Sequence, residues 1–256
     1  MAITQYPRIP VPSNAVPDNF VYSSTSDQKY ALGTILDLED GRRFRYAEVG
    51  AVIAYKALMC QGPVAVANWE TEVQTAKTAA VGDYDIPVLI TTGSTFGAND
   101  WDEGWYIVES GLAGAIGDMY KIASHTVHDT APTITIADPG GVRTALDANQ
   151  VCSIIKSPYK DVVVVPIGAG SNRPIGVPLV DIPIGYFGWF QTRGPCPMIV
   201  DTGETIVAGD RIGEPAAGAV AGTCGVYEAD ATDVPYGYVL CVAAAAEAAI
   251  VDLTLE

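Results

Sequence analysis

The density of glycine and proline constrains this fold more than any other feature of the sequence. The chain of 256 residues contains 26 glycines and 17 prolines. Proline fixes φ and lacks an amide donor, and glycine favours turns, so both residues interrupt regular structure. Hydrophobic residues make up 49% of the chain and charged residues 17%, which permits a sizeable core and argues against disorder. The sequence therefore predicts many short strands joined by turns.

Strand signals begin at Tyr30. Tyr30–Asp37 and Arg42–Ala47 flank an Asp40-Gly41 step, which predicts a β-hairpin. Thr133–Ile136 alternates polar and apolar residues, so we expect one buried and one solvated face. The four valines that open Val162–Ile167 favour a strand buried on both faces. Further strands are expected at Ile86–Thr91, Gly104–Glu109, Met119–Ser124, Gln150–Lys156, Gly185–Gln191, Cys196–Val200, Tyr236–Ala243 and Ala249–Leu255.

This spacing predicts an all-β fold, a barrel or sandwich of many short antiparallel strands. Residues 1–28, with four prolines, predict an extended N-terminal arm, and residues 29–256 a β-rich body in which 80–150 is a candidate second β-lobe. Two segments have helix-forming composition. Trp69–Ala80 is a candidate short helix, whereas Ala243–Ala249 is too poor in large side chains to pack and is expected to be a loop.

Charge and targeting signals limit the partners. A net charge of −16 repels phosphate backbones and anionic lipids, so nucleic acid and membranes are not expected as partners. No run approaches the roughly 18 apolar residues of a membrane span. The start lacks a signal-peptide pattern, which predicts synthesis in a cytoplasm. The five cysteines are therefore expected to be reduced and buried, with a Cys224–Cys241 disulfide as an alternative.

Asp201-Thr202-Gly203 is the sharpest candidate for enzyme chemistry. The triplet resembles the signature of aspartic proteases, in which two carboxylates share a proton. The chain has one such triplet, so a second Asp would have to come from another copy, and Glu204 stands where that family has a small residue. An Asp-x-Gly turn explains the same residues. We therefore expect no catalytic residue here, with an aspartic-type protease at Asp201 as an alternative.

Metal and nucleotide signals are weaker. His125 and His128, next to Asp129, would point to opposite faces of a strand and lack further ligands nearby. Gly168-Ala169-Gly170 follows a valine strand, but Pro174 and later prolines prevent the helix that a phosphate cradle needs. The sequence therefore predicts no metal site and no cofactor.

An aromatic segment is the most interesting candidate for binding. Tyr186, Phe187, Trp189 and Phe190 give a strand with bulky apolar side chains on both faces, followed by Arg193. Such a strand suits a core, a subunit interface or, less well, a platform for stacking sugars. Tyr186, Trp189, Phe190 and Arg193 are the predicted interface residues.

Three segments together resemble a family of tailed-phage virion proteins, the capsid decoration or cement proteins. They are Tyr30–Thr34 with Asp40–Ala47; Glu103-Gly104-Trp105 with Gly117 and Tyr120–His125; and Gly185–Pro195. A Gly209-Asp210 step, the small residues of Gly213–Gly225 and a last strand through Val251–Leu253 follow the same order. The resemblance covers most of residues 30–256, but neither the arm nor Trp69–Ala80.

The resemblance implies a protein without cofactor or catalytic residues. It implies binding to the major capsid protein on the outer surface of a bacteriophage head, often as a homotrimer. The acidic composition, the β-rich body and the arm agree with this expectation. A host- or carbohydrate-binding head or tail appendage is the alternative binding function, and it would need Trp189 and Tyr186 to be exposed.

Overall fold

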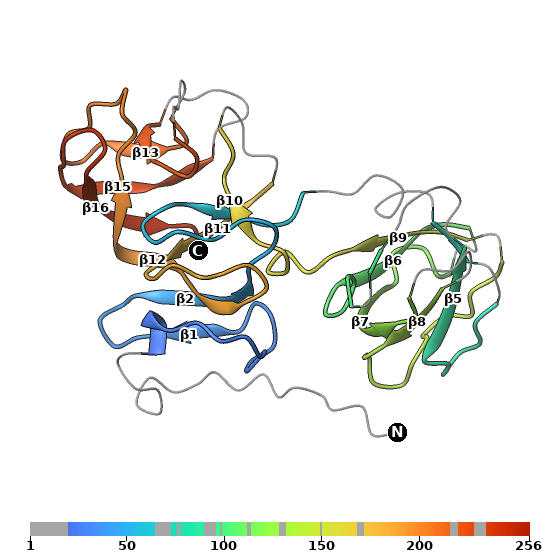
Figure 1. Cartoon of the computed structure of the whole chain (residues 1–256). Helices are drawn as coiled ribbons and strands as arrows, with labels where there is room; N and C mark the ends of the chain where they lie inside the picture. Colours follow the sequence, from blue (N-terminus) through green and yellow to red (C-terminus); the bar gives the residue numbers. More distant parts are fainter. Residues whose placement is uncertain are drawn as a thin grey trace. The chain divides into compact units, whose positions relative to one another are not determined.

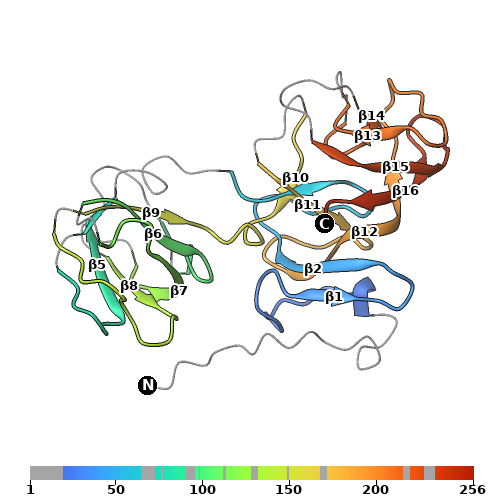
Figure 2. The same ribbon diagram turned by 180° about the vertical axis from the view of Figure 1, so that it is seen from behind.

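A computed structural model describes residues 20–64, 73–75, 78–89, 96–97, 99–111, 114–127, 132–148, 150–167, 172–215, 220–227 and 234–256. The chain divides into two compact units (Figures 1 and 2). The barrel unit comprises the described residues of Ala65–Ser157, and the body those of Pro7–Val64 and Pro158–Glu256. Strands make up both units, so the predicted all-β fold of antiparallel strands is confirmed.

The body is built on one sheet, which has ten strands among the described residues. The strand order is β10-β3-β11-β12-β16-β15-β13-β14, and the hairpin β1–β2 joins it through the pairing of β2 with β12. All the pairings between these strands are antiparallel. The bounds are β1 Ile35–Asp37, β2 Arg43–Glu48, β3 Cys60–Gln61, β10 Val163–Val164, β11 Pro174–Pro178, β12 Phe187–Ile199, β13 Arg211–Gly213, β14 Gly225–Val226, β15 Pro235–Cys241 and β16 Ala248–Thr254.

Strand β12 organises the body because it pairs with three others. Its first part, Phe187–Arg193, pairs with β2, and Phe190–Gln191 also pairs with β11. Its second part, Arg193–Ile199, pairs with β16. Gly194 has a φ of +84°, a conformation that side chains with a Cβ rarely adopt. One strand of 13 residues, Phe187–Ile199, therefore takes up most of the two strands that were predicted separately, Gly185–Gln191 and Cys196–Val200.

The predicted hairpin is confirmed. Asp37 pairs with Arg43 and Ile35 with Arg45, and Gly41 in the connection has a φ of +87°. The Asp40 carboxylate accepts the Arg42 amide, so the side chain supports the turn locally.

The barrel unit is a closed antiparallel barrel in the order β4-β5-β8-β7-β6-β9. Thr133–Ile136 alternates half-buried and buried residues as expected. The bounds are β4 Val73–Thr75, β5 Asp85–Leu89, β6 Trp105–Ser110, β7 Met119–His125, β8 Thr133–Ile136 and β9 Val151–Ile155. The candidate lobe 80–150 lies inside this unit.

Each unit has its own core. In the barrel unit one cluster of buried residues runs from Ala79 to Ile154. The body has three clusters, and none of them includes a residue of the barrel unit among those described. The chain leaves the body after Val64 and returns to it at Pro158. These two points are adjacent, because a Cβ built on Gly62 would lie 3.0 Å from the Pro158 carbonyl oxygen. The barrel unit is thus an insertion between two neighbouring points of the body.

Some expectations need correction. Val73–Thr75 is a strand, so the candidate helix over Trp69–Ala80 is wrong in its described middle. Val163 and Val164 are only half-buried, because β10 lies at an edge of the sheet. The loop expected at Ala243–Ala249 forms a turn that leads into β16.

The predicted arm is described only from residue 20 onward; residues 1–19 lie outside the described residues. Phe20–Tyr22 forms a short 3-10 helix with Val21 buried. The Thr25 amide donates to the Phe187 carbonyl at 3.0 Å. Residues 20–28 therefore belong to the body rather than to a separate arm.

Candidate functional site

Asp201 lies directly after β12 and is buried. One carboxylate oxygen, Oδ1, accepts the Gly203 amide at 3.1 Å. The other, Oδ2, accepts the Val220 amide at 3.1 Å and lies 2.8 Å from the Thr223 hydroxyl. Residues 202–203 form the turn that the sequence also allowed. The carboxylate therefore holds two loops of the body together, and both of its oxygens have partners.

The neighbouring acid is also bonded to the backbone. Glu204 accepts the Val226 amide through Oε2 at 3.2 Å, and it packs against Gly225, where a Cβ would clash with its side chain. An aspartic protease needs two carboxylates that share a proton and face a water molecule. Asp201 instead accepts the amides of Gly203 and Val220, and Glu204 accepts the amide of Val226 in β14.

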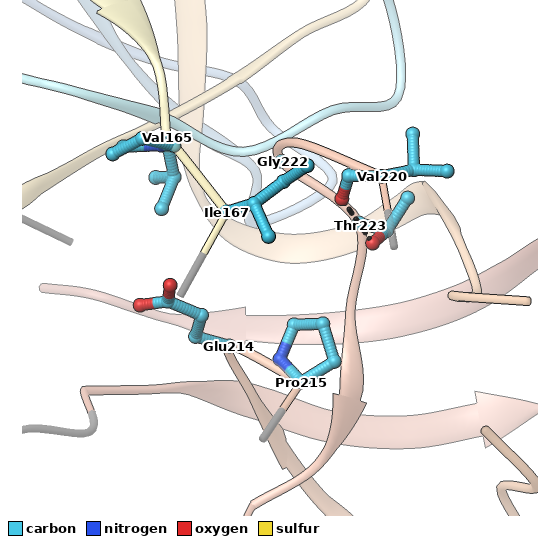
Figure 3. A pocket seen from close by; sticks show the side chains of 8 residues that line it. Val165, Ile167, Glu214, Pro215, Val220, Gly222 and Thr223 are labelled. Carbon is cyan, nitrogen blue, oxygen red and sulfur yellow. Dashed lines mark hydrogen bonds between the residues drawn. The ribbon is translucent and has the colours of Figure 1, made fainter. Parts of the chain in front are cut away.

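A small pocket lies next to this network (Figure 3). Its walls include Val165, Ile167, Glu214 and Pro215, and Thr223 links it to Asp201. Figure 3 also shows the contact between the Thr223 hydroxyl and the Val220 carbonyl, which lie 2.7 Å apart. The pocket has room for about one water molecule.

His125 is the described member of the candidate histidine pair, and its side chain is buried in the barrel unit. Nε2 accepts the Trp101 amide at 3.2 Å, and Nδ1 donates to the Thr126 carbonyl at 2.9 Å. The ring also packs against Phe96 and Trp101. Both ring nitrogens are thus engaged with the backbone, which leaves neither for a metal ion.

Two other candidates lie outside the described residues: His128 with Asp129, and Gly168-Ala169-Gly170. Within the described ranges, no group of three or more His, Cys, Asp or Glu side chains is placed to hold a metal ion. No helix in this part of the chain is long and apolar enough to cross a membrane.

None of the five cysteines forms a disulfide, and four of them are buried as expected. Burial raises the pKa of the Cys60 and Cys196 thiols above their ordinary value and that of Cys224 to about 12. Such thiols are poor nucleophiles because they remain protonated. Cys241 departs from the expectation, since it is exposed on β15.

Two of the four predicted interface residues are buried, and the other two are exposed. Trp189 is 2% exposed and packs on Phe20, Tyr30 and Tyr46, with ring centroids 5.2 to 5.6 Å apart. Phe190 is completely buried in a different cluster, on the opposite face of β12. The assignment of these two to an interface is corrected, because the body itself covers both faces of the strand.

The other two predicted interface residues are accessible. Tyr186 is 37% exposed, and Arg193 is exposed too; their role in an interface stays a prediction. With Trp189 buried, this strand does not present the pair of aromatic rings that a sugar-stacking platform requires.

The sequence analysis missed one feature, an exposed apolar surface on β15 and β16. Tyr238, Leu240 and Ile250 are each about half exposed. A signal was available in Tyr236–Cys241, because a strand with one solvated face should alternate with polar residues and this one does not.

Comparison with protein-family models, with curated proteins and with solved structures found no match for this chain.

Proposed function

We propose that this chain is a non-enzymatic structural protein of a tailed-phage virion, which binds the outer capsid surface as a decoration protein and stabilises the shell. One observation carries the proposal. Of the side chains that the sequence singled out for chemistry, those that the structure describes, Asp201, Glu204 and His125, are bonded to the chain's own backbone. They stabilise a rigid β-structure, so the protein acts through its surfaces.

The segments that resemble decoration proteins occupy structural positions. The segment Asp40–Ala47 contributes β2, and Gly185–Pro195 contributes most of β12. These two strands pair over six positions, from Phe187 with Glu48 to Arg193 with Arg43. The segment Tyr120–His125 contributes most of β7 in the barrel unit. The resemblance thus concerns the framework of both units, which supports a shared architecture rather than a shared reaction.

The charge of the chain supports a protein partner. A net charge of −16 disfavours contact with the packaged nucleic acid and with anionic membranes. A position on the outside of the head, on the major capsid protein and away from the genome, is compatible with such a surface. Many symmetry-related copies would give stable attachment from modest individual contacts.

The direct test adds purified chain to head shells of the phage that encodes it, prepared from a mutant lacking the chain. We expect saturable co-sedimentation, a raised melting temperature of the shells, and density on the outer surface by cryo-electron microscopy. Shells that bind no chain, or particles that carry it only in the tail, would contradict the proposal.

The contribution of the arm is tested by deleting residues 1–19. A longer deletion would be uninformative, because Val21 is buried and Thr25 pairs with Phe187. A chain in which residues 1–19 are shuffled serves as the control with equal length and composition. If the arm binds the shell, both variants bind more weakly than the natural chain; equal affinities would show that the arm has no cementing role.

A further inference from the structure

The side chain of His125, the last residue of β7, is buried in the barrel unit, with 0% of it exposed. Its partner on the neighbouring strand β8 is Ile134, a residue of the barrel core. The ring packs on Trp101 and Phe96, with ring centroids 4.7 and 5.5 Å away. Because water does not reach this ring, its two nitrogens must find their hydrogen-bond partners within the protein.

The two hydrogen bonds of this ring require one protonation state. A backbone N–H can only donate, so the Trp101 amide, 3.2 Å from Nε2, needs a nitrogen without a proton. A backbone carbonyl can only accept, so the Thr126 oxygen, 2.9 Å from Nδ1, needs a nitrogen that carries one. In this arrangement His125 is therefore neutral, with its proton on Nδ1.

The bond to Trp101 helps to hold a strained loop, which runs from Asn99 to Glu103 before β6 and is called the Trp101 loop here. Both of its end residues have left-handed backbones, with φ of +68° at Asn99 and +60° at Glu103. Such conformations persist where the surrounding structure holds them. Strand β7 supplies this support, because the Ile122 carbonyl accepts the Glu103 amide at 3.1 Å and His125 accepts the Trp101 amide.

The Trp101 loop also carries an acid that can bind the ring once the ring is protonated. Asp102 Oδ1 lies 4.0 Å from Nε2, and the Asp102 side chain is 26% exposed. On the same loop, Asp100 accepts a backbone amide, and Glu103 follows Asp102. On β7 itself, the Lys121 ammonium donates to the Glu103 carbonyl, whereas β8 has no charged residue. Among the described residues, Asp102 is thus the one acid within ion-pair distance of the ring.

We propose that His125 is a pH-dependent switch that releases the Trp101 loop of the barrel unit in acid. The neutral ring accepts the Trp101 amide and keeps the loop closed. Protonation turns Nε2 into a donor, so the bond to Trp101 is lost and the ring binds the Asp102 carboxylate instead. The closed loop needs Nε2 without a proton and the open loop has one there. The closed loop is therefore favoured at neutral pH and loses stability as the pH falls below about 6.5, where histidine takes up a proton.

The first test measures the protonation state of the ring by NMR of nitrogen-labelled histidine in the full chain. The chain has two histidines, so a His128→Gln variant leaves the His125 ring as the single imidazole signal. At about pH 7.5 we expect a proton on Nδ1 and none on Nε2, and at about pH 5.5 a proton on both. A proton on Nε2 at the higher pH, or a ring that stays neutral at the lower pH, would overturn the proposal.

The second test measures the loop through hydrogen exchange of the Trp101 amide. Its protection factor, corrected for the intrinsic effect of pH on exchange, should fall at least about ten-fold between about pH 7.5 and about pH 5.5. In His125→Gln the side-chain amide offers an oxygen to Trp101 and an N–H to Thr126 but takes up no proton, so its protection should not depend on pH. His128→Gln is the matched control and should behave as the natural chain does. Equal protection at both pH values in the natural chain, or an equal fall in His125→Gln, would contradict the switch.

Asp102→Asn tests the exchange of partners. The asparagine has the same size but no charge with which to stabilise the protonated ring, so the Trp101 loop should open at a lower pH than in the natural chain. Asp85→Asn is the matched control, because Asp85 is an exposed acid of the same unit on β5, and its midpoint of opening should equal that of the natural chain. A midpoint that stays unchanged or rises in Asp102→Asn would show that the protonated ring does not bind Asp102 and would overturn the proposal.

Discussion

At the scale of single residues, buried carboxylates serve the architecture of the body. Burying an acid is costly unless its oxygens find donors. Asp201 meets this condition with two backbone amides and one hydroxyl, contributed by Gly203, Val220 and Thr223. Glu256 is stabilised differently, by charge: its Oε1 accepts the Arg45 guanidinium at 2.8 Å, and its Oε2 lies 4.0 Å from the Arg43 guanidinium. Arg45 in turn donates to the Gly33 carbonyl, so this pair ties the segment after β16 to β2 and to the loop before β1.

Asp201→Asn is expected to destabilise the body by about 1–3 kcal/mol. The asparagine keeps one acceptor, but its amide group must then face at least one donor that the carboxylate accepted. Asp181→Asn is the control: Asp181 is exposed and accepts one amide, that of Lys56, so a change below about 0.5 kcal/mol is expected. Urea unfolding followed by circular dichroism measures both variants. Unchanged stability of Asp201→Asn, or a pepstatin-sensitive peptidase activity that this substitution abolishes, would contradict the structural role.

At the scale of elements, local signals predicted some strands and tertiary contacts decided others. The β1–β2 hairpin was predictable because Asp40 and Gly41 supply its turn within the hairpin itself. Strand β11, Pro174–Pro178, was not, because proline removes a ladder donor and is unfavourable within a sheet. It pairs nevertheless with β3 and β12, with a register shift between Pro174 and Gly176. Neither partner could be inferred from the local sequence.

The burial of the predicted interface residues also depends on distant segments that the local sequence does not reveal. Trp189 and Tyr186 lie three residues apart and have similar composition around them, but Trp189 is covered by Phe20, Tyr30 and Tyr46 from distant segments. Sequence could indicate that β12 has bulky side chains on both faces. It could not say which of these faces the body would cover with its own residues.

The pairing of β15 with β16 depends on Gly237. This glycine is opposite Leu253, and a Cβ there would overlap the Asp252 carbonyl oxygen. Gly237→Ala should therefore destabilise the body by about 2 kcal/mol or more, through overpacking. Gly203→Ala is the matched control, since its Cβ would meet nothing closer than 3.8 Å. Thermal unfolding of both variants checks the prediction; equal melting temperatures would show that β15 and β16 can separate to admit a side chain.

At the scale of the whole molecule, two units with separate cores share one chain. The barrel unit closes its own sheet, so it leaves no strand edge that depends on the body. Its described core residues lie between Ala79 and Ile154, and all of them belong to that unit. The body's sheet contains strands from both sides of the insertion, with β3 before it and β10 after it. The closed barrel with its own core, and a body sheet built from both sides of the insertion, together indicate that each unit folds independently.

We therefore expect the body to fold without residues 65–157. Gly62 and Pro158 are adjacent, and the Asn172 side chain also donates to the Pro63 carbonyl, so a short glycine-serine linker can join Val64 to Pro158 without strain. The shortened chain should unfold in one cooperative transition, and the separately expressed barrel unit should unfold in another, together reproducing the transitions of the full chain in calorimetry. The control is the isolated barrel unit in which a linker of equal length replaces β9. This change opens the closed sheet and should abolish the barrel's transition. A shortened body that fails to fold would mean that the inserted unit supports the sheet.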